Sequence, residues 1–159
     1  MIKAAFFDMD GTISAPKYIN FGKAVVGFSP ENWIAYCNLV KNDTYKHCKV
    51  VEPILEFARQ LKKNGTHVYI LTMSLSQAEI DAKRVFIRDH ALQTIFEECI
   101  FVDTNDEKID VIRQYAKQHY YPLTQCMLIE DTYTTLLKTA ELGIKSVHVS
   151  NIIANNMPT

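Results

Sequence analysis

Two aspartates, Asp8 and Asp10, stand one residue apart in the stretch FFDMDGTIS. They follow the apolar run IKAAFF and precede a Gly–Thr pair. Carboxylates this close repel each other, and each resists losing its hydration when the chain folds around it. A bound cation, a shared proton or an electrophilic substrate would compensate. The pair is therefore a candidate site of chemistry.

Five short apolar runs predict the strands that would position this pair. Near-continuous apolar sequence is typical of parallel strands covered on both faces, and the gaps between the runs carry helical periodicity. The alternation predicts an α/β fold with a doubly wound, mainly parallel five-stranded sheet. The predicted strands are 2–7, 67–72, 99–103, 126–130 and 145–149. One predicted helix precedes each of the last four strands: 51–65, 76–92, 107–120 and 132–143.

Polar residues gather where three of these strands end. Asp8 and Asp10 follow the first strand, Thr72 ends the second, and Glu130 and Asp131 end the fourth. The carboxyl ends of parallel strands meet at one edge of a sheet, and ligands of such sheets bind at that edge. The predicted topology, more than any single residue, brings these side chains to one place.

Residues 14–50 do not fit the alternation, because usual connections take about 2–6 residues. Within them Ser29 caps and Pro30 begins a predicted helix, SPENWIAYCNLV. We predict a single domain, 1–159, with 14–50 as a small cap insertion within it. A helix packed on the side of the sheet explains the segment equally well.

Four stretches resemble the motifs of the haloacid dehalogenase-like hydrolases, in the same order. DMDGT is similar to their D-x-D-G-T motif, and YILTMS to their second motif. Lys108 in TNDEKIDVI is similar to the third, and MLIEDTYTTLLKTAELGI to the "ED" form of the fourth. The resemblance covers the chain except 14–50, and it implies a Rossmann-like fold and phosphatase chemistry.

The resemblance implies a role for each polar residue. Asp8 would be the nucleophile that forms an aspartyl-phosphate, and Asp10 would protonate the leaving oxygen and then activate water. The family's dehalogenases lack this second acid, so Asp10 favours phosphate esters. Thr72 would donate its hydroxyl to a phosphoryl oxygen. Lys108 would neutralise the transferring group, and its place in the first turn of a predicted helix, where the dipole disfavours a cation, requires an anion nearby.

The resemblance also implies a Mg²⁺ site. Asp8, Asp131 and the backbone carbonyl of Asp10 would hold the ion, since Mg²⁺ prefers oxygen ligands, and its charge would resolve the crowding of the acids. Glu130 would act behind these ligands or on a metal-bound water. Many relatives carry an acid where this chain has Thr135, which predicts a weaker metal site.

Composition excludes several other classes. The net charge is −1 and the basic residues are scattered, so we predict no nucleic-acid partner. No apolar run approaches the roughly 20 residues of a membrane helix, and we expect a cytoplasmic protein with reduced cysteines. The spacing of Cys37, His47 and Cys48 matches no zinc pattern.

The main prediction is a Mg²⁺-dependent phosphatase acting on a small phosphorylated substrate. A phosphotransferase or mutase would use the same aspartyl-phosphate, and a non-catalytic phosphate-binding protein would keep the fold. A phospho-accepting receiver domain would have to use Asp103 at the end of the third predicted strand. Substrate choice would fall to the insertion, with Tyr18, Trp33 and Tyr36 as candidates that packing explains equally well. The sequence leaves the oligomeric state open.

Overall fold

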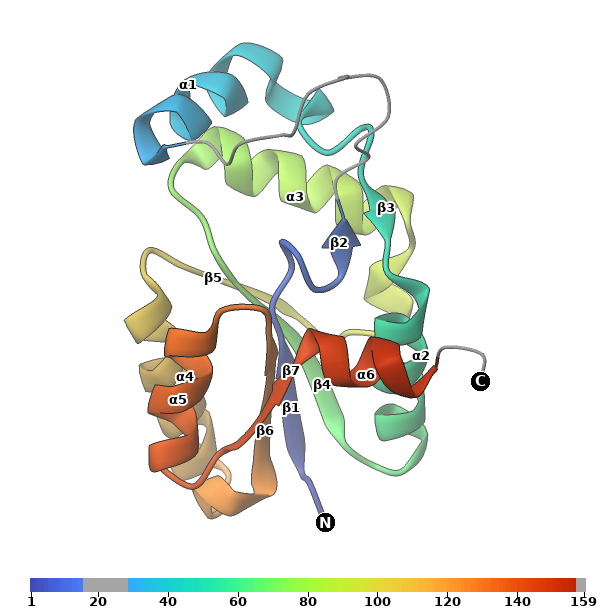
Figure 1. The fold of residues 1–159 in the computed structure, drawn as a ribbon, viewed down its shortest axis with the longest axis vertical. Helices are drawn as coiled ribbons and strands as arrows, with labels where there is room; N and C mark the ends of the chain where they lie inside the picture. The colour runs from blue at the N-terminus through green and yellow to red at the C-terminus, as the bar shows by residue number, and fades with distance from the viewer. Residues whose placement is uncertain (16–28, 157–159) are drawn as a thin grey trace.

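A five-stranded sheet forms the centre of the computed structural model, which describes residues 1–15 and 29–156. All neighbouring strands are parallel, and their order is β5-β4-β1-β6-β7, so β1 is central (Figure 1). This confirms the predicted parallel α/β sheet. The strands are β1 (Ala4–Phe7), β4 (His67–Met73), β5 (Cys99–Val102), β6 (Cys126–Glu130) and β7 (Lys145–His148).

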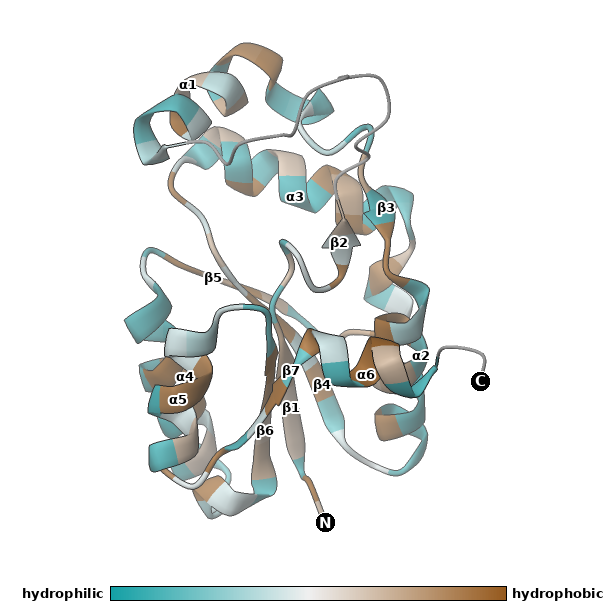
Figure 2. Cartoon of the chain, in the orientation of Figure 1, coloured by the Kyte–Doolittle hydropathy of each residue, from teal (hydrophilic) through white to brown (hydrophobic). Residues whose placement is uncertain are grey.

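Helices cover both faces of the sheet, because side chains of a strand alternate between its faces. Ala5 and Phe7 of β1 belong to one buried cluster with side chains of α2, α3 and α6. Ala4 and Phe6 belong to a second cluster with α4 and α5. Figure 2 shows apolar residues along the strands and polar residues on outward helix surfaces. The helices are α2 (Glu52–Lys63), α3 (Gln77–Asp89), α4 (Asn105–Gln118), α5 (Tyr133–Glu141) and α6 (Val149–Asn155).

The element boundaries differ from the predictions in two informative places. Helix α4 begins at Asn105, before the predicted start, because the Thr104 side chain accepts a hydrogen bond from the Glu107 N–H and caps it. Helix α6 was not predicted. It has 7 residues and buries Val149 and Ile152, which is too short a segment for helical periodicity to be recognised in the sequence.

The predicted insertion enters and leaves through a two-stranded antiparallel ladder. Strand β2 (Ser14–Ala15) pairs with β3 (Lys49–Val50). Between them, α1 (Pro30–Val40) begins with Ser29 as its cap, as predicted, and η1 (Lys41–Asp43) follows it. Residues 16–28, including the candidate Tyr18, lie outside the described residues.

The described part of the insertion packs on α3. Figure 1 shows α1 and α3 together beyond the carboxyl ends of the strands, and both α1 and η1 contact α3. The Trp33 ring stacks on Tyr36 and meets Tyr45 edge-on, so packing engages Trp33 and Tyr36. The role of the segment as a cap stays a prediction. Within the described ranges, no helix has the length and apolar character to cross a membrane.

Candidate active site

The end of β1 places Asp8 at the middle of the carboxyl edge. The strand lies between β4 and β6, and the Asp8 N–H donates to the Ile129 carbonyl of β6 at 2.9 Å, which extends the pairing to the last residue before the turn. Asp8 is buried, and Glu130 at the end of β6 is buried beside it. The predicted convergence of these strand ends is therefore present.

Lys108 joins two of the carboxylates. Its Nζ lies 2.9 Å from Asp8 Oδ1 and 2.7 Å from Glu130 Oε2, and all three side chains are almost fully buried. Charge-assisted hydrogen bonds of this length are the strong class. They supply the anions that a lysine in the first turn of α4 requires. Glu130, expected to act behind the ligands, thus contacts Lys108 directly.

Asp131 completes the cluster. One carboxylate oxygen each of Asp8, Glu130 and Asp131 lie within 4.8 Å of one another. The backbone at Gly11 makes room for this approach, because its φ is +75° and a Cβ there would collide with Asp131 Oδ2. Glycine adopts such a φ without strain and leaves the space open. Both the turn and the acid cluster therefore require glycine at position 11.

The charges of this cluster shift its pKa values in different directions. Burial raises the pKa of Asp8 well above its usual range, although Lys108 opposes the shift. Burial and the neighbouring Glu130 raise the pKa of Asp131 to about 6. Burial also acts against ionised Glu130, but a side-chain hydrogen bond with Asp131, together with the charge and the hydrogen bond of Lys108, outweighs it and lowers the pKa of Glu130. The pKa of Glu130 is therefore lowered, whereas the pKa values of Asp8 and Asp131 are raised.

Thr72 and Asp10 lie on the other side of Asp8 and share a second buried lysine. Lys83 of α3 donates to Thr72 Oγ1 at 2.8 Å and lies 3.0 Å from Asp10 Oδ2. The Thr72 side chain is fully buried, whereas the Asp10 side chain is partly exposed. The six predicted site residues therefore lie along one sheet edge, where Lys108 contacts Asp8 and Glu130, and Lys83 contacts Asp10 and Thr72.

Sequence analysis missed Lys83, although the helix pattern contains a signal. The buried residues of α3 are Glu79, Ala82, Lys83 and Phe86, which is the spacing of one helix face. A glutamate and a lysine four residues apart on the apolar face of a helix are unusual, because buried charges need partners. That placement, taken with the sheet edge next to it, would have marked Lys83.

Comparison with known proteins identifies the fold. No family model matches the chain, and no curated protein matches its sequence. Among solved structures, CbbY from Rhodobacter sphaeroides in complex with phosphate is 15% identical, with a TM-score of 0.63 over 93% of this chain and 86% of that one. A haloacid dehalogenase-like hydrolase from Streptococcus pneumoniae is 18% identical, with a TM-score of 0.62 over 98% and 91%. The chain has the haloacid dehalogenase-like fold.

A third solved structure of this fold holds ligands. An enzyme of the haloacid dehalogenase family from Bacteroides thetaiotaomicron, in complex with magnesium and inorganic phosphate, is 11% identical, with a TM-score of 0.57 over 93% of this chain and 94% of that one. At these identities the likeness establishes the fold, as the four sequence stretches implied. The individual residue roles stay predictions.

The donor set at this edge of the haloacid dehalogenase-like fold fits a hard divalent cation. Asp8, Glu130 and Asp131 offer oxygen atoms only, which Mg²⁺ prefers. Their charges exceed that of Lys108, and burial, together with the neighbouring Glu130, raises the pKa values of Asp8 and Asp131. Asp8 and Asp131 are the side chains that would hold the ion. Both Glu130 oxygens already accept hydrogen bonds, Oε2 from Lys108 and Oε1 from the Asp131 N–H, whereas Lys108 contacts Asp8 through Oδ1.

Protons should compete with Mg²⁺ for Asp131. A carboxyl with a pKa of about 6 is mostly protonated at pH 5 and ionised at pH 7.5, and only the ionised form binds the metal. We expect the dissociation constant for Mg²⁺ to be about tenfold larger at pH 5 than at pH 7.5. Isothermal titration of the protein with MgCl₂ at both pH values measures it. Asp131→Asn should weaken binding at pH 7.5 and remove the pH dependence that Asp131 contributes; equal wild-type affinities at the two pH values would contradict the assignment.

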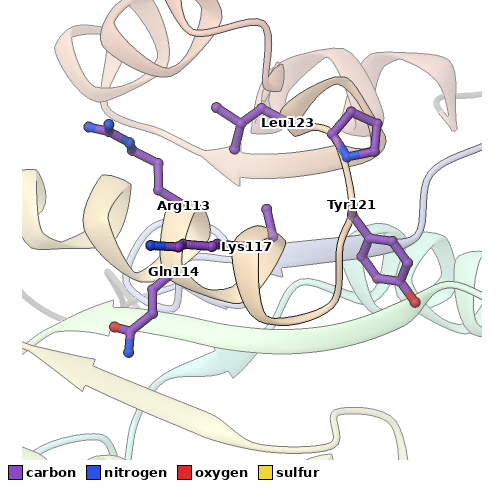
Figure 3. Close-up of a pocket in the computed structure, with 7 residues that line it drawn as sticks. Arg113, Gln114, Lys117, Tyr121 and Leu123 are labelled. Atoms are coloured by element: carbon purple, nitrogen blue, oxygen red, sulfur yellow. The ribbon is translucent and has the colours of Figure 1, made fainter.

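Two other features lie outside this site: Asp103 and a surface hollow at the end of α4. Asp103 follows β5, an edge strand, and is exposed, so the receiver-type alternative lacks a central acid there. A hollow of about 650 Å³ lies between the last turns of α4 and the connection 121–123 that follows it, lined by Arg113, Gln114 and Lys117 among others (Figure 3). It lies at the opposite end of α4 from Lys108.

Proposed function

We propose that this protein is a Mg²⁺-dependent phosphatase that hydrolyses a small phosphate monoester through an aspartyl-phosphate on Asp8. The observation that carries the proposal is the environment of Asp8. It is a buried carboxylate at the end of the central strand, 2.9 Å from the Lys108 ammonium and grouped with Asp131. The phosphate held by solved structures of this fold supports the substrate class.

Two displacements at phosphorus make up the reaction. Asp8 attacks phosphorus, the ester P–O bond breaks, and the leaving oxygen takes a proton from Asp10. Asp10 then removes a proton from water, the water oxygen attacks phosphorus, and the bond to Asp8 breaks. Inorganic phosphate and free Asp8 result. The second step depends on a base beside the nucleophile, and Asp10 becomes that base when it gives up its proton in the first step.

The remaining residues stabilise charge on the transferring group. Lys108 approaches Asp8 from α4 and faces the incoming phosphoryl oxygens together with the carboxylate that attacks them. The Thr72 hydroxyl supplies a neutral donor from the end of β4. Mg²⁺, when bound, supplies the additional positive charge that two anions, carboxylate and phosphate, need in order to meet. A cytoplasmic location, a small-molecule substrate and the absence of a nucleic-acid partner stay predictions.

Phosphate release from p-nitrophenyl phosphate and a panel of phosphorylated metabolites tests the proposal. With Mg²⁺ we expect turnover, and with EDTA a loss of about 10³-fold, because a catalytic metal contributes several kcal/mol to phosphoryl transfer. Release into water without an added acceptor distinguishes hydrolysis from transfer to another hydroxyl. A folded wild-type protein that binds inorganic phosphate but releases none from any ester would instead indicate the non-catalytic alternative.

A further inference from the structure

Lys83 is a fully buried cation that the reaction proposed above does not use. Its side chain has no exposed surface, and its ammonium lies within 3.2 Å of five oxygen atoms. These are Thr72 Oγ1 at 2.8 Å, the Met73 carbonyl at 2.6 Å, Ser74 Oγ at 3.1 Å, Asp10 Oδ2 at 3.0 Å and Glu79 Oε1 at 3.2 Å. Burying an ammonium is costly unless it is paired and hydrogen-bonded, and here both conditions are met.

This ammonium connects three separate elements of the site. Thr72 and Met73 belong to the end of β4, Asp10 belongs to the turn after β1, and Lys83 itself belongs to α3, on which the insertion packs. Glu79, one turn earlier on α3, is fixed in turn, because its carboxylate accepts from the Leu75 N–H at 2.6 Å. Hydrogen bonds and ion pairs therefore hold both Lys83 and its partner Glu79 in place.

The contact with Thr72 decides what the threonine hydroxyl can do. A hydroxyl has one proton to donate and two lone pairs to accept with, and Lys83 occupies a lone pair. The contact of Thr72 Oγ1 with the Met73 carbonyl is 3.5 Å, which is too long for a strong hydrogen bond. The Thr72 proton is therefore available to an acceptor at the sheet edge, such as a phosphoryl oxygen.

The contact with Asp10 holds the acid in place. The Asp10 side chain is 46% exposed, so packing by itself does not fix its rotamer. The 3.0 Å ion pair with Lys83 supplies the missing restraint. A general acid has to lie within hydrogen-bond reach of the leaving oxygen, and even a small displacement of such a group lowers the rate.

We propose that Lys83 is a positioning residue for the phosphatase reaction, which orients the Thr72 hydroxyl toward the phosphoryl group and holds the Asp10 carboxyl at the leaving oxygen. The inference rests on the proposed function. It assigns Lys83 no contact with substrate: Lys83 acts through Thr72 and Asp10. Lys108 contacts the nucleophile and Lys83 orders the acid, so the two lysines divide the site between them.

The test compares two esters of nearly the same shape, phenyl phosphate and p-nitrophenyl phosphate, with Lys83→Met. Phenolate is the poorer leaving group and depends more on a positioned acid. We expect kcat/KM, which reports the first displacement, to fall about 100-fold for phenyl phosphate and about 10-fold for p-nitrophenyl phosphate. Damage to the fold would lower both values by the same factor.

Glu79→Gln is the matched control, because it alters the same buried network and leaves the lysine contacts with Thr72 and Asp10 in place. Its ratio of kcat/KM between the two esters should stay within about threefold of wild type. Lys83→Met leaves Glu79 without its cation, so the double variant Lys83→Met/Glu79→Gln is measured as well, with circular dichroism on all proteins. We expect it to show the Lys83→Met ratio.

The possible failures are distinguishable. Equal losses on both esters in a folded Lys83→Met or double variant would overturn the role of Lys83 and leave the proposed function standing. Unchanged kcat/KM values for both esters in Lys83→Met would also overturn the role of Lys83 and leave the proposed function standing. A wild-type protein that releases phosphate from neither ester would overturn the proposed function itself, and the positioning role with it.

Discussion

Asp8→Asn is expected to lower phosphate release by at least about 10⁴-fold, because the variant has no carboxylate to attack phosphorus. The fold should survive the change. In the wild-type protein Lys108 donates to Asp8 Oδ1 at 2.9 Å, and the asparagine oxygen can accept the same hydrogen bond. The measurement is the single-turnover and steady-state rate of phosphate release with Mg²⁺ present.

The stability of Asp8→Asn should be equal to that of wild type or higher. Burial raises the pKa of Asp8 in the folded protein, so ionised Asp8 costs stability, and that cost grows as the pH rises through the unfolded value toward the folded one. The amide carries no charge and avoids the cost. A melting temperature at or above that of wild type at pH 7.5 would show that the lost activity does not come from unfolding.

Asp103→Asn is the matched control for this substitution. Asp103 is an exposed acid that follows the edge strand β5 at the same edge of the sheet, and it is the acid that a receiver-type protein would phosphorylate. Its replacement should leave phosphate release unchanged. Activity that is lost with Asp103→Asn and kept with Asp8→Asn would reverse the assignment of the nucleophile.

Lys108→Met should have the second largest effect, on both activity and stability. It removes the cation that pairs with buried Asp8 and Glu130 at 2.9 and 2.7 Å. Breaking a buried pair by removing one partner costs about 3–5 kcal/mol, because it leaves uncompensated charge. Activity should fall by about 10³-fold, as for other charge stabilisers in phosphoryl transfer.

The loss of stability in Lys108→Met should depend on pH with a definite sign. Without the ammonium, burial raises the folded pKa of both carboxyls above their unfolded values, so their protonated forms are favoured in the folded protein. Stability is then highest at low pH and falls as the pH rises through these pKa values. Urea unfolding should therefore show a smaller difference from wild type at pH 5 than at pH 7.5.

Lys138→Met provides the comparison for that experiment. Lys138 also pairs with an aspartate, Asp106, at 2.7 Å, but the two side chains are 55% and 72% exposed. Exposed pairs contribute little, so we expect a change within about 1 kcal/mol and little dependence on pH. A pH-independent loss in Lys108→Met, equal to the loss at pH 7.5, would contradict the view that unpaired carboxylates cause it.

The mainly parallel five-stranded sheet and the convergence of Asp8, Thr72 and Glu130 at one of its edges could be predicted from the sequence. Near-continuous apolar runs separated by helical periodicity specify a parallel sheet, and a parallel sheet brings the carboxyl ends of its strands to one edge whatever the details of packing. Lys108 was predicted from the resemblance to the family's third motif, and its place in the first turn of a helix, where a cation needs an anion nearby, supported that prediction. These inferences use local pattern, topology and the resemblance only.

The tertiary structure decided which side chains touch across elements. The pairing of Lys108 with Glu130 as well as Asp8, and the contacts of Lys83 with Thr72 and Asp10, depend on how α4 and α3 are rotated against the sheet. Packing of whole helix faces sets that rotation, and local sequence contains only the spacing along each helix. The packing of the insertion, through α1 and η1, on α3 is likewise a contact between elements that are distant in the sequence.

The sequence by itself therefore determined the α/β sheet, the edge that carries the chemistry and the resemblance to the haloacid dehalogenase-like hydrolases. Only the tertiary structure showed that two buried lysines divide that edge, Lys108 at the nucleophile and Lys83 at the acid. The physical reason is that the hydrophobic pattern of a strand lies in consecutive residues and can be recognised from the local sequence. The partner of a buried charge comes from another element, and the packed core selects it.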